Sequence, residues 1–445
     1  MAMDAYDLST SAANAAATAA FEEAVHGLAA HRPSTGAAIG RALAADPDHV
    51  PALALKGFAN LILAREELAA PARDALAAAK AALAAKDGGT ADERALVEAL
   101  GHAARDRFTQ AADCLDARFA DRPATFLPFK IAHALRFMLG DARGMLAESQ
   151  RMMVRWSADR PAAGFLLGCH AFAVEEHGAY GAAEAYGRLA VSLQPEDSWG
   201  AHAVSHVHEM RGDTEAGIAW LEGSRASWSR CNNFSFHMAW HLALLHLERG
   251  DHERVLRLYD QEVRPQQTDD FRDVANAVSL LWRLDRLGVD VGGRWAEMAE
   301  IARKRRADTS LVFASLHTLI ALVALGDRPA AAELLMALQV RAQGDGDQAR
   351  VAAEVGLPLA RAITGMGAER GSLDRIAASV PRLGGSNAQR DLFVLALAEA
   401  AARRGDHGAV RAIRGARRRL KAEDRLIAAV DGRTVSPNAR LRALR

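Results

Sequence analysis

"AFAVEEHGAYGAAEAYGRLAVSLQP", residues 171–195, is the stretch that decides the expected fold. Apolar residues recur at three- and four-residue steps on both sides of Gly178, as they do on amphipathic helices. Ala171, Ala183 and Ala190 are small residues that let two antiparallel helices approach each other closely. The stretch therefore predicts one helix–turn–helix unit with its turn at Gly178.

Similar turn glycines recur along the chain at a nearly constant distance. They are Gly140, Gly178, Gly212, Gly250, Gly288, Gly326 and Gly405. The successive spacings from Gly140 to Gly326 are 38, 34, 38, 38 and 38 residues. Such a period is typical of tetratricopeptide-like helix pairs, which must stack because one pair cannot bury its own apolar face. We therefore expect an all-α, tetratricopeptide-like helical-repeat solenoid of stacked antiparallel helix pairs, with a period of about 34–40 residues.

The repeat pattern also suggests how the chain is divided. Residues 1–35 are expected to form an N-terminal helical cap, residues 36–410 the solenoid, and residues 411–445 a basic C-terminal helical segment. An arginine-rich helix face of that kind is usually solvated, and without interleaved aromatic residues it does not indicate nucleic-acid binding.

Composition narrows the class of protein. The chain has 55 basic and 55 acidic residues, well mixed, so no whole-protein field attracts nucleic acid or a membrane surface. Its three cysteines are scattered, which is typical of a reducing compartment. No signal-like start and no membrane-spanning apolar run is found, so we expect a cytoplasmic protein with no membrane partner. A homodimer is left open.

The run "HAVSHVHEM" introduces the candidate site. His202 and His206 stand four residues apart with Glu209 three further on, and His237 and His241 form a second such pair. Residues at this spacing share one helix face, where they could hold a metal, run acid/base chemistry, bind a ligand or fill a core. The glutamate does not lie between the histidines as in zinc proteases, so no metal and no cofactor is expected. A bound divalent metal stays an alternative.

Repeat register joins these histidines to other polar residues. His241, Ser279 and His317 each lie nine residues before a turn glycine, so they occupy equivalent positions in consecutive units. First helices of such repeats line the concave face, where we expect a polar strip. The candidate catalytic residues are His202, His206, Glu209 and His241. The candidate substrate-binding residues are His237, Trp240, Asn276, Ser279, Trp282, Arg283, His317, Ser386, Gln389 and Arg390. Arg283 would suit a carboxylate or phosphate group.

The run "GGSNAQRD", residues 384–391, allows two interpretations. Glycines before a helix start can present backbone N–H groups to an anion. Alternatively, Ser386 or Asn387 caps the next helix, which places Gln389 and Arg390 in its first turn.

Several runs together resemble a known family: "FAVEEHGAYGAAEAYGR", "WGAHAVSHVHEMRG", "HMAWHLALLHLERGD", "SLLWRLDRLGVDVGGRW" and "GGSNAQRD". The chain resembles bacterial members of the tetratricopeptide repeat protein 38 family over about residues 40–410. The resemblance implies an all-helical repeat fold and a cytoplasmic protein, and carries no established activity. Its polar runs favour a ligand or catalytic site over packing alone. Asn276 departs from the aspartate common in the family, which puts any role of that acid in doubt here.

Two functions follow from the sequence. The first is a histidine-rich concave pocket that binds a small polar or anionic molecule, with acid/base chemistry of hydrolase or lyase type if the protein is an enzyme. The second is a tetratricopeptide-type scaffold that holds a peptide or partner protein in its groove. Clustered histidine, tryptophan and serine with little lysine favour the first, and whether the protein is an enzyme stays open.

Overall fold

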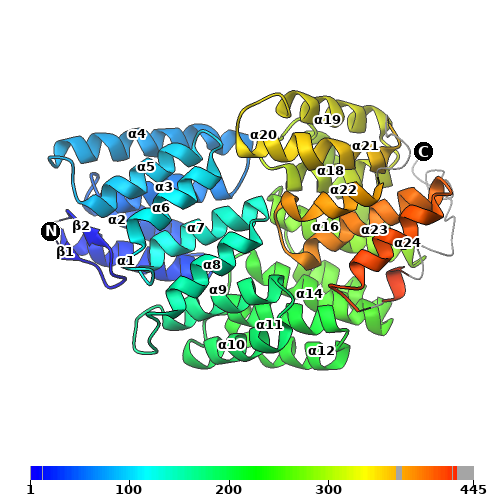
Figure 1. The fold of residues 1–445 in the computed structure, drawn as a ribbon, viewed down its shortest axis with the longest axis horizontal. Coiled ribbons are helices and arrows are strands. Elements are labelled where there is room, and N and C mark those ends of the chain that lie inside the picture. The colour runs from blue at the N-terminus through cyan, green and yellow to red at the C-terminus, as the bar shows by residue number, and fades with distance from the viewer. Residues whose placement is uncertain (1, 13, 367–372, 423, 428–445) are drawn as a thin grey trace. The chain divides into compact units, whose positions relative to one another are not determined.

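The structure is a computed structural model that describes residues 2–12, 14–366, 373–422 and 424–427. It contains two compact units (Figure 1). The first unit comprises residues 1–207 and 223–234, and the second comprises residues 208–222 and 235–445. Each unit is described by itself below.

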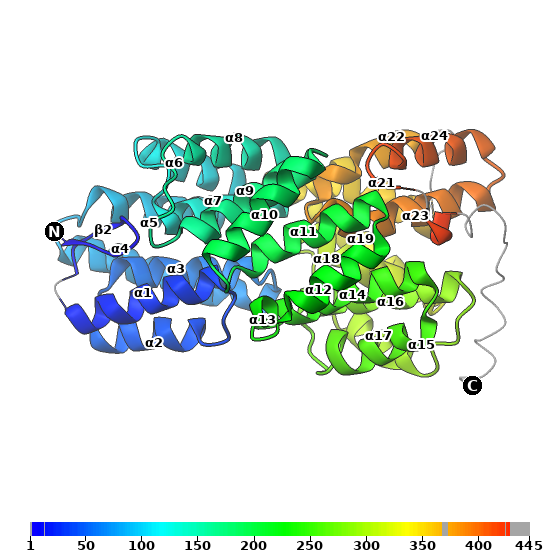
Figure 2. The same cartoon turned by 90° about the horizontal axis from the view of Figure 1, so that it is seen from below.

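The first unit begins with a short antiparallel strand pair, β1 (Ala2–Met3) and β2 (Ser9–Thr10). Its helices are α1 (Ala15–Ala29), α2 (Thr35–Ala45), α3 (Val50–Ile62), η1 (Glu66–Leu68), α4 (Ala69–Ala85), α5 (Ala91–Ala103), α6 (Phe108–Phe119), α7 (Phe126–Leu139), α8 (Ala142–Met153), α9 (Ala163–Glu176), α10 (Tyr180–Leu193) and α13 (Arg225–Trp228). Helix α11 (Ser198–Arg211) belongs to this unit up to Val207. Consecutive helices pack as pairs, for example α1 with α2, which lie side by side in Figure 2.

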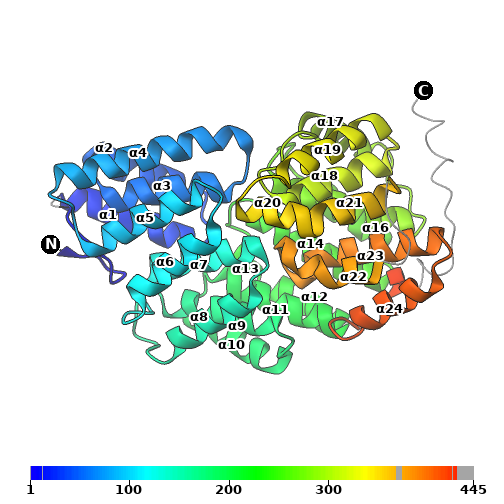
Figure 3. The same ribbon diagram turned by 45° about the horizontal axis from the view of Figure 1, so that its top comes forward.

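The second unit is also helical in the part that the structure describes. Its helices are α12 (Thr214–Gly223), α14 (Phe234–Arg249), α15 (His252–Leu258), η2 (Tyr259–Val263), α16 (Phe271–Arg286), α17 (Arg294–Lys304), α18 (Val312–Ala324), α19 (Arg328–Arg341), α20 (Asp347–Val351), η3 (Ala352–Gly356), α21 (Leu357–Thr364), α22 (Leu373–Ser379), η4 (Val380–Leu383), α23 (Asn387–Arg403) and α24 (His407–Arg417). Helix α18 packs against α16, α19 and α21, which Figure 3 shows around it.

The turn glycines explain the regular length of the helix pairs. All seven have positive φ, from 66° at Gly140 to 86° at Gly250. This left-handed conformation is nearly free of cost only for glycine, so each glycine ends one helix and lets the next one reverse. After Gly140, Gly326 and Gly405, an aspartate then caps the following helix through its side chain.

Small residues let neighbouring helices touch closely, as the sequence indicated. A Cβ atom on Gly187 of α10 would lie 2.9 Å from the carbonyl oxygen of Gly200 and 2.6 Å from the side chain of Val204, both on α11. Nearby, Ala171, Phe172 and Ala203 belong to one buried cluster of the first unit. The helices therefore approach at their glycines and alanines and fill the space beside them with larger side chains.

The predicted fold class, all-α and tetratricopeptide-like with stacked antiparallel helix pairs, is confirmed. Residues 1–35, predicted as a helical cap, include α1 and also the strand pair. The predicted basic segment 411–445 begins inside α24, and its residues 428–445 lie outside the described residues. Among the helices that the structure describes, none is both long and apolar enough to cross a bilayer.

Candidate functional site

In the first unit, His202 and His206 form the histidine pair of α11. Both side chains are at most 1 % exposed, and their ring centroids lie 4.2 Å apart. Nδ1 of His206 lies 3.1 Å from Oε2 of Glu175, a fully buried residue near the end of α9. An ionised carboxylate can only accept a hydrogen bond, so Nδ1 of His206 carries the hydrogen and donates it to Glu175. This contact fixes the ring in the Nδ1-protonated tautomer. His202 is held differently, by stacking on Phe172 at an interplanar angle of 12°.

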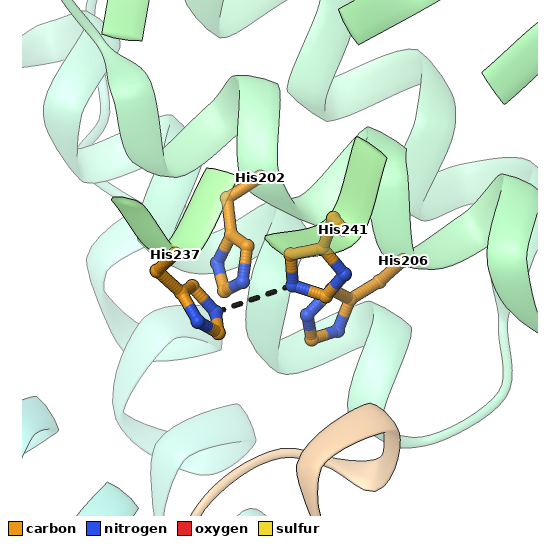
Figure 4. A group of neighbouring side chains, drawn as sticks. All are labelled: His202, His206, His237 and His241. Atoms are coloured by element: carbon orange, nitrogen blue, oxygen red, sulfur yellow. Dashed lines mark hydrogen bonds between the residues drawn. The ribbon is translucent and has the colours of Figure 1, made fainter. Parts of the chain in front are cut away.

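In the second unit, His237 and His241 form the corresponding pair of α14 (Figure 4). Nδ1 of His241 donates to Oε2 of Glu209 at 3.0 Å, and Nδ1 of His237 donates to Oδ1 of Asn276 at 3.0 Å. The two Nε2 atoms face each other at 3.2 Å, which is the contact drawn dashed in Figure 4. Both rings are therefore fixed at Nδ1 and converge at Nε2.

Lys421 completes this chain of contacts from the C-terminal part of the second unit. Its ammonium group donates to Oε1 of Glu209 at 2.9 Å, and both residues are buried. Burial alone would raise the pKa of Glu209, but the attraction of Lys421 and the hydrogen bond from His241 hold that pKa well below its ordinary value. Glu209 is thus an ionised acceptor that orients His241.

The basic segment near residue 420 is not only a solvated face. Arg417 is 6 % exposed and donates to Asp391 at 2.6 Å, and it also pairs with Asp424. Burial would raise the pKa of Asp391, but Arg417 and Lys421 lower it to about 2. Arg419 on the same segment is exposed to solvent, as the sequence predicted for the basic residues of this segment in general.

Arg283 lies beside these ion pairs on α16. It is 1 % exposed and donates to the backbone oxygen of Ser279 at 3.2 Å and to its hydroxyl. Its nearest carboxylate is Asp391, at 3.7 Å, which also serves Arg417 and Lys421. Its guanidinium lies 6.0 Å from the ring centroid of Trp240. Burial lowers the pKa of Arg283 despite these neighbours.

Trp240 connects Arg283 to the histidine pair. Its indole stacks on the ring of His237 with centroids 5.2 Å apart, so Trp240, His237, Asn276 and Arg283 form one contiguous buried set. Trp282, also a candidate, is buried as well, but its ring contacts the guanidinium of Arg286 at 4.7 Å.

His317 occupies the predicted repeat position on α18. Its Nδ1 donates to the backbone oxygen of Phe313 in its own helix at 2.9 Å, and its ring packs against Phe313 and Phe393. Burial lowers its pKa to about 4, so the ring is neutral near pH 7. The described contacts are those of a packed core histidine.

The loop of residues 384–391 is a helix cap. The Ser386 hydroxyl accepts from the backbone N–H of Gln389, and the Gln389 side chain accepts from that of Ser386, which is a capping box. Arg390 donates to the carbonyl of Gly385 and, at 2.8 Å, to the side chain of Asn387. Of the two sequence interpretations, the capping one accounts for these contacts.

Comparison with known proteins adds little to this geometry. No family model matches the chain. A chain in the structure of Naa15/Naa10 bound to HypK-THB is similar at 16 % identity and a TM-score of 0.26. The match covers 92 % of this chain and 64 % of that one, so the chain spans less than two thirds of that neighbour's length. The likeness to the tetratricopeptide repeat protein 38 family therefore stays a resemblance, and what stands is an all-α helical-repeat protein.

Proposed function

We propose that the second unit binds a small oxyanion, a carboxylate or a phosphate, at Trp240, Asn276 and Arg283. The observation that carries this proposal is a set of buried donors. Among the described residues, no hydrogen-bond acceptor is within reach of Nε1 of Trp240, Nδ2 of Asn276 or Nη2 of Arg283. All three side chains are at most 2 % exposed.

The shared character of these atoms defines the ligand. Leaving a buried donor unsatisfied costs about 1–3 kcal/mol, and one ligand that reached all three donors would remove that cost. All three are N–H groups, and an acceptor-rich ligand with negatively charged oxygens matches them. A guanidinium is the side chain best suited to carboxylate and phosphate groups.

Local charge supports the same conclusion. Asp391 lies within 4 Å of three cationic groups, those of Arg283, Arg417 and Lys421, and it is closest to Arg417. Arg283 therefore shares that carboxylate with two other cations, and Arg417 holds it more closely. A bound oxyanion would compensate the charge of Arg283 in surroundings where burial already disfavours it.

Calorimetric titration with inorganic phosphate and with oxalate tests this function. We expect one of the two anions to bind, and Arg283→Gln to weaken binding at least tenfold while circular dichroism stays unchanged. Arg286→Gln is the matched control, because Arg286 lies one turn further along α16 and pairs with Glu399. Oxalate-only binding would identify a carboxylate ligand and phosphate-only binding a phosphate ligand. Failure of both anions to bind at millimolar concentration would overturn the proposal.

The scaffold alternative has one observation in its favour. Met336 and Val340 lie one turn apart on α19 and are 58 % and 71 % exposed. Two side chains form a small patch, whereas peptide-binding faces use several anchors along a groove. The proton-transfer chemistry expected of a hydrolase or lyase stays a prediction.

A further inference from the structure

We propose that Nε2 of His237 and Nε2 of His241 hold a divalent transition-metal ion. This site goes beyond the oxyanion function and does not depend on it. Two observations support it. The two Nε2 atoms face each other, and the Nδ1 atom of each ring is held by a hydrogen bond to a neighbouring side chain.

The distance between the two nitrogens fits a metal centre. A tetrahedral ion with metal–nitrogen bonds of about 2.0–2.1 Å places two imidazole nitrogens about 3.3 Å apart. The Nε2 atoms of His237 and His241 lie 3.2 Å apart. Histidines one helical turn apart share a face, so α14 presents this pair without distortion of its backbone.

The tautomers of His237 and His241 make the contact between their Nε2 atoms unfavourable unless a cation lies between them. Nδ1 of His241 donates to Glu209, and Nδ1 of His237 donates to the amide oxygen of Asn276. A neutral imidazole that carries its hydrogen on Nδ1 has a lone pair on Nε2. Two lone pairs that face each other at this distance repel, and a positive charge shared by both nitrogens removes the repulsion. A metal ion and a shared proton are the two candidates.

The hydrogen-bond partners of the two Nδ1 atoms favour a metal ion over a shared proton. Metal-binding histidines usually donate their other nitrogen to a carboxylate or a carbonyl oxygen, which fixes the tautomer and raises ligand basicity. Glu209 and Asn276 occupy these positions for His241 and His237. Lys421 in turn holds Glu209 in place.

The first unit contains a similar arrangement at His206. His206 stands four residues after His202 on α11 and donates from Nδ1 to buried Glu175. Ligand atoms of Glu175, Glu176 and His206 all lie within 4.8 Å of one another. A histidine pair with an orienting glutamate therefore occurs twice in the chain. Imidazole ligands of this kind suit zinc, cobalt, nickel or copper better than magnesium or calcium.

Cobalt(II) titration of the full chain, stripped with a chelator, tests the site. We expect visible d–d bands that saturate, and at least tenfold weaker binding in the His237→Ala/His241→Ala double variant. His246→Ala is the matched control, because His246 is a buried histidine on the same helix that contacts Arg249. Absence of saturable binding, or equal binding by the double variant and the control, would show that a proton alone joins the rings.

Two further variants keep the proposal testable if the double variant does not fold. Asn276→Asp places a carboxylate behind His237, so cobalt should bind several-fold tighter. An unchanged affinity in that variant would count against the site. Arg283→Gln should lose the oxyanion and keep cobalt, which separates failure of the metal proposal from failure of the oxyanion proposal.

Discussion

Lys421 donates a 2.9 Å hydrogen bond to Glu209, although the two residues are 212 positions apart in the sequence. Through Glu209, which accepts from His241, the C-terminal part of the second unit orients a histidine on α14. The candidate site thus depends on Lys421, a residue that lies outside the repeats expected over residues 36–410.

Replacing Lys421 should destabilise the second unit. Lys421→Met leaves the buried carboxylate of Glu209 without its cation, and breaking a buried pair from one side costs about 3 kcal/mol or more. Urea unfolding should show a lower midpoint for this variant and an unchanged one for Arg419→Met, whose side chain is exposed. Equal midpoints would mean that water replaces the lysine.

Asp197 should make stability depend on pH. Burial raises its pKa from 3.8 to about 7 in the folded chain. From about pH 4 to pH 7 the unfolded chain has lost this proton and the folded chain keeps it, so the free energy of unfolding falls as pH rises. Asp197→Asn should flatten this part of a stability–pH curve while still accepting from the backbone N–H of Gly200. Parallel curves for both proteins would contradict the assignment.

Gly168 should not tolerate a side chain. A Cβ atom there would lie 2.1 Å from Oδ2 of Asp197, which is buried and bound to the backbone of Gly200. We expect Gly168→Ala to lower the free energy of unfolding by about 1–3 kcal/mol in thermal or urea melts.

Gly40 offers the matched control for Gly168. It lies inside α2, and a Cβ atom there would meet nothing within 4 Å. Gly40→Ala should stabilise the chain by about 0.5–1 kcal/mol, because alanine loses less backbone entropy on folding. If both variants lost stability equally, contact with Asp197 would not be the cause of the loss at Gly168.

Ser386 should contribute to stability rather than to ligand binding. Ser386→Ala removes one half of the capping box, which should cost about 1 kcal/mol, and Ser386→Thr should keep it. Calorimetric titration with phosphate and oxalate should give the same affinities for both variants. If Ser386→Ala lost anion binding and Ser386→Thr kept it, the loop of residues 384–391 would be part of a ligand site.

Much of the fold could be predicted because its signals are local. A glycine with positive φ ends a helix at a defined residue. The spacing of seven such glycines predicted the period of the repeat. The i, i+4 spacing of His237 and His241 likewise predicted that they share one face of α14, which the structure confirms.

The rest of the site could not be predicted from local signals. His317 and His241 occupy equivalent repeat positions, yet His317 donates to its own helix and packs on phenylalanines, while His241 donates to Glu209. The repeat register determines the position of a residue on its helix, but it does not determine which other residue its side chain contacts. The pairing of Lys421 with Glu209 has no local signature at all, since a single lysine in a basic run resembles every other lysine.

The Lys421–Glu209 pair also sets an order of events during synthesis. At about 5–20 residues per second, roughly 10–40 s separate the translation of Glu209 from that of Lys421. Throughout that interval the carboxylate beside His241 has no lysine to neutralise it, so burying it costs more than it does in the complete chain. We therefore expect the histidine pair of the second unit to reach its final arrangement only after Lys421 has been made, later than the helices that carry the pair.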